Sequence, residues 1–316
     1  MKSFSLLIFA VMLFTGSLCA GQKIIFDTDL AGDIDDAFAQ ALVQISPEFE
    51  VLGITVGDGP TEGRGRVSCR MLWEAGQDSI PVAVGRATRV GSELPLQIHW
   101  GDEFGRYKPV AESAADFIIR MLKKYPNEVT IISVGPVTNL GDVIRKDPAA
   151  WKLVKEVYSM FGSFYMGYGG DSRPSAEWNV KADVPSAQLF MTSGVPITLA
   201  GLDVTTMVKF NKDRRLQLLY RNSPLTDAIS ALYSLWSFDR SENRQDPTLY
   251  DPVAVAMAIT DEFVSLREAH VRVTDEGYTI VDESKAPNCR IGMNISTGRF
   301  TEWLTRKLLI QNNIRH

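Results

Sequence analysis

Short apolar runs alternate with longer amphipathic stretches along most of this 316-residue chain, and the alternation limits the folds open to it. Strands are predicted over residues 23–26, 51–56, 80–84, 129–134 and 196–200, and helices over 36–45, 65–75, 111–124 and 138–146. Alternating β and α elements favour a mainly parallel sheet with helices on both faces. We therefore predict a single α/β domain with an open, Rossmann-like sheet that binds ligands at the C-terminal ends of its strands.

The middle of the chain is less regular. Residues 161–174 are rich in glycine and aromatic side chains, and residues 91–108 form a polar, glycine-containing stretch of loop length. Long loops in a compact domain are often functional. Further predicted elements are a helix after Asp251, a strand near Val271, a turn over 275–277 and a terminal helix over 301–310. No repeat or linker divides the sequence.

The first 20 residues have the layout of a secretory signal peptide. Lys2 precedes an apolar run over residues 4–14, which is too short to span a membrane comfortably, and small residues follow it. A lipid-modified N-terminus at Cys19 is less favoured, because Leu18 stands where such a site needs a small residue. We expect a mature domain over 21–316 that is secreted or periplasmic, with no membrane span.

Charge and cysteine content narrow the class of protein. The formal net charge of −5 argues against a nucleic-acid surface, which needs a basic excess, and suits a small neutral or cationic ligand. Beyond Cys19 the chain has only Cys69 and Cys289, which is no disulfide framework. Whether these two cysteines pair is left open by their spacing.

An acidic segment carries the strongest chemical signal. Five aspartates fall within ten residues between a predicted strand and a predicted helix: Asp27, Asp29, Asp33, Asp35 and Asp36. Packed carboxylates raise one another's pKa values unless a cation neutralises them. Because all the candidate ligands are oxygens, calcium or magnesium is favoured over zinc.

Two other interpretations compete for this segment. A helix-loop-helix calcium loop beginning at Asp27 is disfavoured, because Ala31 and Phe38 stand at positions five and twelve, where ligands belong. A phosphatase of the haloacid dehalogenase type, with Asp27 as nucleophile, is the stronger rival because its strand also ends in Phe-Asp-x-Asp. Such enzymes usually continue with Gly-Thr, whereas here the run goes on to Asp35-Asp36.

Four motifs in order resemble the inosine-uridine preferring nucleoside hydrolases over nearly the whole mature chain. The acidic segment is similar to a longer variant of that family's Asp-x-Asp-x-Gly-x-Asp-Asp-Ala signature. The later matches are Val134-Gly135-Pro136-Val137-Thr138-Asn139, then Ala176-Glu177-Trp178-Asn179 with Asp183, and finally Tyr250-Asp251-Pro252.

The resemblance implies Ca²⁺-dependent hydrolysis of the N-glycosidic bond of small-molecule ribonucleosides, giving ribose and free base through an oxocarbenium-like transition state. It implies calcium ligands at Asp29, Asp36, Asp251 and the Val134 carbonyl, with Asp29 also acting as the base. Asp35, Glu177, Asn179 and Asp251 would bind the ribose. A homo-oligomer, dimer or tetramer, is left open.

Three residues depart from the family pattern or match it incompletely. Asp58 stands where an asparagine that contacts the sugar is common, and we expect it to bind substrate. Tyr250 replaces a histidine that helps protonate the leaving base, and a tyrosine is a weaker acid. His99 resembles the family's mobile His-Gly loop, interrupted by Trp100, and is a further catalytic candidate.

These departures also leave open a non-catalytic, exported nucleoside-binding protein. We also expect residues 177–179 to be extended. In that conformation the side chains of Glu177 and Asn179 would face the same side, while Trp178 would point away and pack.

Overall fold

The computed structural model describes residues 21–88, 95–239 and 246–311, and over these ranges no helix has the length and apolarity that crossing a membrane requires. Eight strands form one sheet in the order β3-β2-β1-β4-β5-β6-β10-β7, and β8 pairs with β9 in a separate hairpin. The sheet is parallel except for the edge pair β10–β7. The strands are β1 Gln22–Thr28, β2 Phe49–Val56, β3 Val82–Val84, β4 Thr130–Ser133, β5 Glu156–Met160, β6 Ile197–Ala200, β7 Val264–Ala269, β8 Val271–Val273, β9 Thr279–Val281 and β10 Cys289–Ile295.

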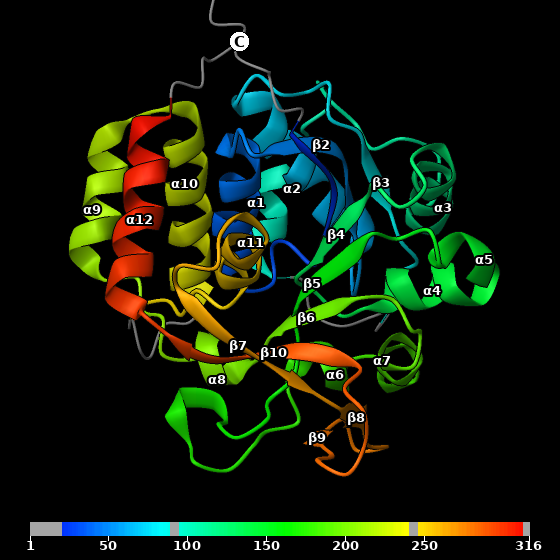
Figure 1. Cartoon of the computed structure of the whole chain (residues 1–316). Coiled ribbons are helices and arrows are strands. Elements are labelled where there is room, and N and C mark those ends of the chain that lie inside the picture. The colour runs from blue at the N-terminus through cyan, green and yellow to red at the C-terminus, as the bar shows by residue number, and fades with distance from the viewer. Residues whose placement is uncertain (1–20, 89–94, 240–245, 312–316) are drawn as a thin grey trace, which may run out of the picture.

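Helices cover both faces of this sheet (Figure 1). One face carries α1 Asp35–Ile45, α2 Thr61–Glu74, α10 Pro224–Asp239, α11 Asp251–Ile259 and α12 Thr297–Ile310, and the other carries α3 Ala114–Lys124, α4 Thr138–Lys146, α5 Pro148–Trp151 and α7 Val184–Met191. The remaining helices are α6 Trp178–Lys181, α8 Leu202–Thr205, α9 Lys212–Arg221 and the 3₁₀ turns η1 Leu96–Gly101 and η2 Tyr168–Gly170.

Successive side chains of β1 pack alternately against the two helical layers. Ile24 and Phe26 pack into the core on the α1 side, whereas Ile25 packs into the core on the α3 side. This two-residue period follows from strand geometry, since successive side chains point to opposite faces. Because both faces are covered, the middle of β1 is a continuous apolar run, Ile24-Ile25-Phe26, as expected of a central parallel strand.

The strand order reverses at β1. β1 pairs with β2 on one side and with β4 on the other, so that Asp27 lies opposite Thr55 and Ser133. The connection through α1 leads to β2, and the later connection through α3 leads to β4 on the opposite side. Connections that leave neighbouring strands in opposite directions open a crevice at their carboxyl ends, which is where open α/β sheets bind ligands.

The predicted fold class is confirmed, including the mainly parallel sheet and helices on both faces. Sequence patterns missed β5, β7, β9 and β10 and the helices α5 to α10. Cys69 and Cys289 are both buried free thiols, which answers the question left open by their spacing. The predicted signal peptide, residues 1–20, lies outside the described residues.

Gly53 of β2 permits close packing of α3 on the sheet, and this predicts a stability effect. A Cβ at Gly53 would lie 2.3 Å from Phe117 Cζ and 3.1 Å from the Pro81 carbonyl oxygen. We expect Gly53→Ala to lower the free energy of unfolding by about 1–3 kcal/mol, because overpacking displaces a buried ring. Urea denaturation would measure the loss. Gly105→Ala is the matched control, since a Cβ there meets nothing within 4 Å; equal stability of the two variants would contradict the prediction.

Candidate active site

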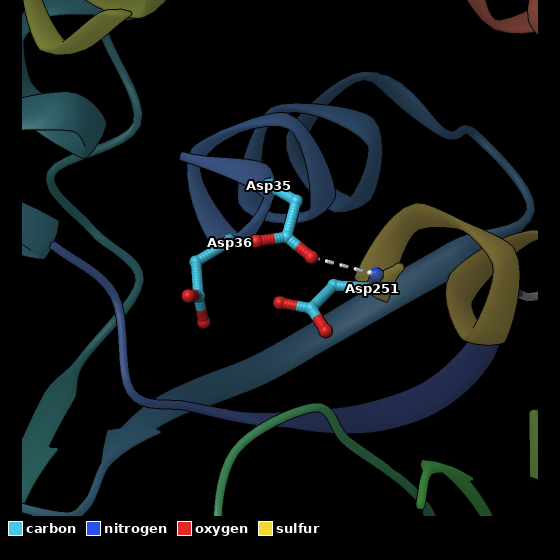
Figure 2. A group of neighbouring side chains, drawn as sticks. All are labelled: Asp35, Asp36 and Asp251. Atoms are coloured by element: carbon cyan, nitrogen blue, oxygen red, sulfur yellow. Dashed lines mark hydrogen bonds between the residues drawn. The ribbon is translucent and has the colours of Figure 1, made fainter. Parts of the chain in front are cut away.

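Three carboxylates meet where the starts of two helices converge. Asp35 and Asp36 open α1, Asp251 opens α11, and one oxygen from each lies within 4.8 Å of the others. Figure 2 shows the three side chains directed into a common space. Asp35 Oδ2 accepts hydrogen bonds of 3.1 Å from the N–H groups of Tyr250 and Asp251, so it caps α11 from the neighbouring helix.

This carboxylate cluster (Asp35, Asp36 and Asp251) is electrostatically costly when no cation is bound. Burial raises the pKa of each aspartate well above its usual range, and the adjacent carboxylates raise each pKa further. The positive ends of α1 and α11 favour the anionic forms only partly. The donors are all oxygens, which suits a hard divalent cation. The chemistry of the cluster therefore fits a metal site.

A cavity of about 470 Å³ opens beside the carboxylate cluster. It lies at the carboxyl ends of β1, β4 and β5, as the strand order predicts. Its lining combines most of the residues singled out from the sequence with several others: Asp29, Gly32, Asp33, Asp35, Asp36, Arg64, Pro95, Val134, Met160, Tyr168, Glu177, Trp178, Asn179, Tyr250 and Asp251.

Arg64 is the one basic side chain in that lining, counting the described residues. It projects from α2 and is buried; its Nε donates to the Asp58 carbonyl and its Nη1 to the Leu30 carbonyl, both at 2.7 Å. Its Nη2 lies 3.7 Å from Asp29 Oδ2. Arg64 therefore ties the loops after β1 and β2 together and places a positive charge beside Asp29. No sequence motif indicated a role for Arg64, because only the fold brings Leu30, Asp58 and Asp29 next to its guanidinium.

Glu177 and Asn179 line the cavity from the start of α6. Glu177 accepts hydrogen bonds from the backbone N–H groups of Gly162, Asn179 and Val180, and burial raises its pKa to about 7. The Asn179 amide nitrogen donates to the carbonyls of Val134 at 2.9 Å and Met160 at 3.0 Å. The expected extended segment is wrong, because α6 begins at Trp178, and that indole is 46% exposed rather than packed away.

Asp27 is a structural residue beneath the cavity rather than part of its lining. It is fully buried and accepts hydrogen bonds from Thr55 Oγ1 at 2.6 Å, Asn139 Nδ2 at 2.7 Å and Ser133 Oγ at 3.2 Å. Burial raises the pKa of Asp27 to about 6, although the three hydrogen bonds lower it in part. A carboxylate enclosed in this way cannot attack a phosphate group, so the phosphatase interpretation fails on geometry.

Asp58 and His99 lie outside the lining of this cavity. Asp58 is buried in a left-handed conformation with φ of 57°, and its Oδ1 accepts a hydrogen bond of 2.7 Å from the Thr88 hydroxyl. His99 is exposed on η1, where Nδ1 lies 2.7 Å from Asp102 Oδ2. The substrate-binding role of Asp58 and the catalytic role of His99 stay predictions.

The sequence of this chain is similar to that of known proteins. The sequence profile of the family described as inosine-uridine preferring nucleoside hydrolase matches residues 24–302. Uridine nucleosidase 1 of Arabidopsis thaliana is 30% identical over 281 residues, covering 83% of this chain and 82% of that protein. The pyrimidine-specific ribonucleoside hydrolase RihA of Citrobacter koseri is 26% identical over 308 residues, covering 90% and 97%.

Solved structures share the fold. A plant nucleoside hydrolase, PpNRh1, superposes with a TM-score of 0.81 at 23% identity, covering 92% of this chain and 99% of that one. The purine-preferring ribonucleoside hydrolase of Gardnerella vaginalis gives 0.78 at 24% identity, covering 91% and 98%.

The chain has the fold of solved nucleoside hydrolases, with a buried oxygen-donor cluster at the strand-order reversal of its sheet. Because the family profile matches residues 24–302, the chain belongs to the inosine-uridine preferring nucleoside hydrolase family. It is thus an enzyme of the nucleoside N-ribohydrolase class, which hydrolyses ribonucleosides to ribose and base, and the family is metal-dependent.

Repulsion within the carboxylate cluster predicts an unusual effect of a neutral substitution. We expect Asp251→Asn to raise the melting temperature of metal-free protein by a few degrees, because an isosteric amide removes one of three buried charges. Differential scanning fluorimetry in excess chelator would measure it. Adding Ca²⁺ should stabilise the unsubstituted protein far more than the variant. A lower melting temperature for Asp251→Asn in chelator would contradict the repulsion.

Proposed function

We propose that this chain is a Ca²⁺-dependent ribonucleoside hydrolase that acts by the direct attack of water on the anomeric carbon of the ribose. The observation that carries the proposal is the carboxylate cluster, three buried acids within 4.8 Å at the floor of a cavity large enough for a nucleoside. No single helix or loop holds all three acids, so their convergence is a product of the whole fold.

The proposed ion ligands are Asp29, Asp36, Asp251 and the Val134 carbonyl, which all line the cavity, and Asp35 lies with Asp36 and Asp251 in the carboxylate cluster. The Val134 carbonyl already accepts one hydrogen bond from Asn179, which leaves its second lone pair for an ion. A bound divalent cation would polarise sugar hydroxyls and lower the pKa of water. Calcium is favoured over magnesium because irregular cages of several carboxylates and a carbonyl suit the larger ion.

The side chains around the cluster account for the rest of the chemistry. Asp29 accepts a proton from the attacking water, and Arg64 Nη2, at 3.7 Å from Asp29 Oδ2, orients that carboxylate. Both amide hydrogens of Asn179 are used by carbonyls, so its Oδ1 accepts from a sugar hydroxyl. Asp35 and Glu177 hold the remaining hydroxyls. Their negative charge stabilises the oxocarbenium-like cation as the glycosidic bond breaks.

The proposed substrate rests on similar proteins, and the proposed cellular location rests on the N-terminal sequence. The named relatives act on uridine and other pyrimidine ribonucleosides, so uridine is our first candidate substrate, within a salvage role. We also propose export to the periplasm or beyond, which rests on the charged, apolar and small-residue order of residues 1–20.

The catalytic assignment predicts that Asp29→Asn lowers kcat for uridine by at least about a thousandfold, because the proton acceptor is lost while the volume of the side chain is kept. Release of reducing sugar measures turnover, and circular dichroism checks the fold. Asp213→Asn, which removes an exposed carboxylate on α9, is the matched control. Chelation should abolish activity and Ca²⁺ should restore it. Unchanged turnover in Asp29→Asn would overturn the mechanism.

Recognition of the ribose hydroxyls predicts discrimination against deoxyribose. We expect 2′-deoxyuridine to be cleaved with kcat/KM at least about a hundredfold below that of uridine, because a missing hydroxyl leaves buried polar partners unmatched. Side-by-side measurement of base release tests this. Equal kcat/KM values for the two substrates would show that the 2′-hydroxyl is not held by the site.

A further inference from the structure

Among the described residues, the lining of the cavity contains no histidine, the side chain that most often protonates a leaving group. The chain has three histidines, His99, His270 and His316. His99 is exposed and bound to Asp102, His270 Nδ1 lies 2.8 Å from the Ala286 carbonyl, and neither lines the cavity. His316 lies outside the described residues. The guanidinium of Arg64 is always charged and is held by two backbone carbonyls, so it is no proton donor.

The charge around the cavity strongly favours cations. Its described lining contains one guanidinium and six carboxylates: Asp29, Asp33, Asp35, Asp36, Glu177 and Asp251. With all six ionised, as a bound cation favours, their formal charge with Arg64 is −5, and a divalent cation would reduce it to −3. A concave site lined by one sign of charge concentrates ligands of the opposite sign. A base that carries a positive charge is therefore attracted, whereas a base that departs as an anion is repelled.

Aromatic rings stand beside these acids. Tyr168 and Tyr250 make an edge-to-face pair with centroids 6.1 Å apart, and Tyr168 Oη accepts a hydrogen bond of 2.9 Å from the Trp178 backbone N–H. Tyr168 and Trp178 are 42% and 46% exposed, so ring surface is available at the cavity. Burial raises the pKa of both tyrosines, which keeps the phenols neutral. Neutral aromatic faces attract flat cations.

We propose that the preferred substrates of this site are ribosides of cationic aromatic bases, in which the glycosidic bond itself quaternises the ring nitrogen. This deepens the proposed function and rests on it. When the bond between C1′ and nitrogen breaks, its electron pair moves to the ring nitrogen, and the base leaves neutral without being protonated. The water oxygen bonds to C1′, and one proton is released to solvent. A neutral nucleoside leaves an anionic base, which must gain that proton at the site.

Two pairs of substrates test the proposal at pH 6 with the full enzyme and Ca²⁺. Nicotinamide riboside is compared with uridine, and 7-methylguanosine with guanosine, by the kcat/KM for release of base. We expect the cationic member of each pair to exceed the neutral one by at least about tenfold. Equal or lower values for the cationic members would overturn this inference while leaving the hydrolase intact. Cleavage of none of the four would instead refute the proposed function.

Cationic ribosides also have a weaker glycosidic bond, which would speed their cleavage at any site. Variants of Tyr250 and Tyr168 test whether the preference belongs to this site. Tyr250→His supplies a proton donor, so it should raise kcat/KM for uridine several-fold and narrow the cation-to-neutral ratio, whereas Tyr250→Phe should not. Tyr168→Leu removes an aromatic face and should lower the ratio about three- to tenfold, while Tyr168→Phe keeps it. Ratios that stay constant across all four variants would show that the preference lies in the substrates and would overturn the proposal.

Discussion

Mutual repulsion among buried carboxylates is the constraint on which the functional part of this structure depends. Asp35, Asp36 and Asp251 converge from two helix starts, and burial leaves them little solvent to disperse their charge. Several contacts limit the cost: the start of α11 donates two N–H groups to Asp35, Thr28 Oγ1 donates to Asp36, and Arg64 faces Asp29. These contacts leave a strongly negative centre, which favours a cation and a positively charged transition state.

The sheet makes this arrangement possible by reversing its strand order at β1. Residues that follow β1, β4 and β5 are carried to one edge, and the two hydrophobic cores hold that edge in place from opposite faces. Asp27 contributes below the cavity by binding side chains of β2, β4 and α4. Within the acidic segment, Asp27 therefore holds the strands together, whereas Asp29, Asp35 and Asp36 line the cavity.

Much of the fold and site could be predicted from local patterns. Apolar runs located β1, β2, β4 and β6, because buried parallel strands have few polar interruptions. The crowded aspartates indicated a cation site, and eight of the predicted site residues share the lining of one cavity. The sheet strands β5, β7 and β10 and the helices α9 and α10 were missed, since their patterns become interpretable only against neighbours distant in the sequence.

By itself, the sequence determined the chemistry of this protein: a strand-ending acidic turn, a later Asp-Pro at a helix start, and no histidine in the motif that precedes it. Only the tertiary structure decided which carboxylates meet, that Arg64 stands beside Asp29, and that Trp178 is exposed at a short helix instead of packed behind a strand. The reason is physical. Residue type fixes which charges and donors exist, but their distances across more than 200 residues are set by how the sheet and its two helical layers pack.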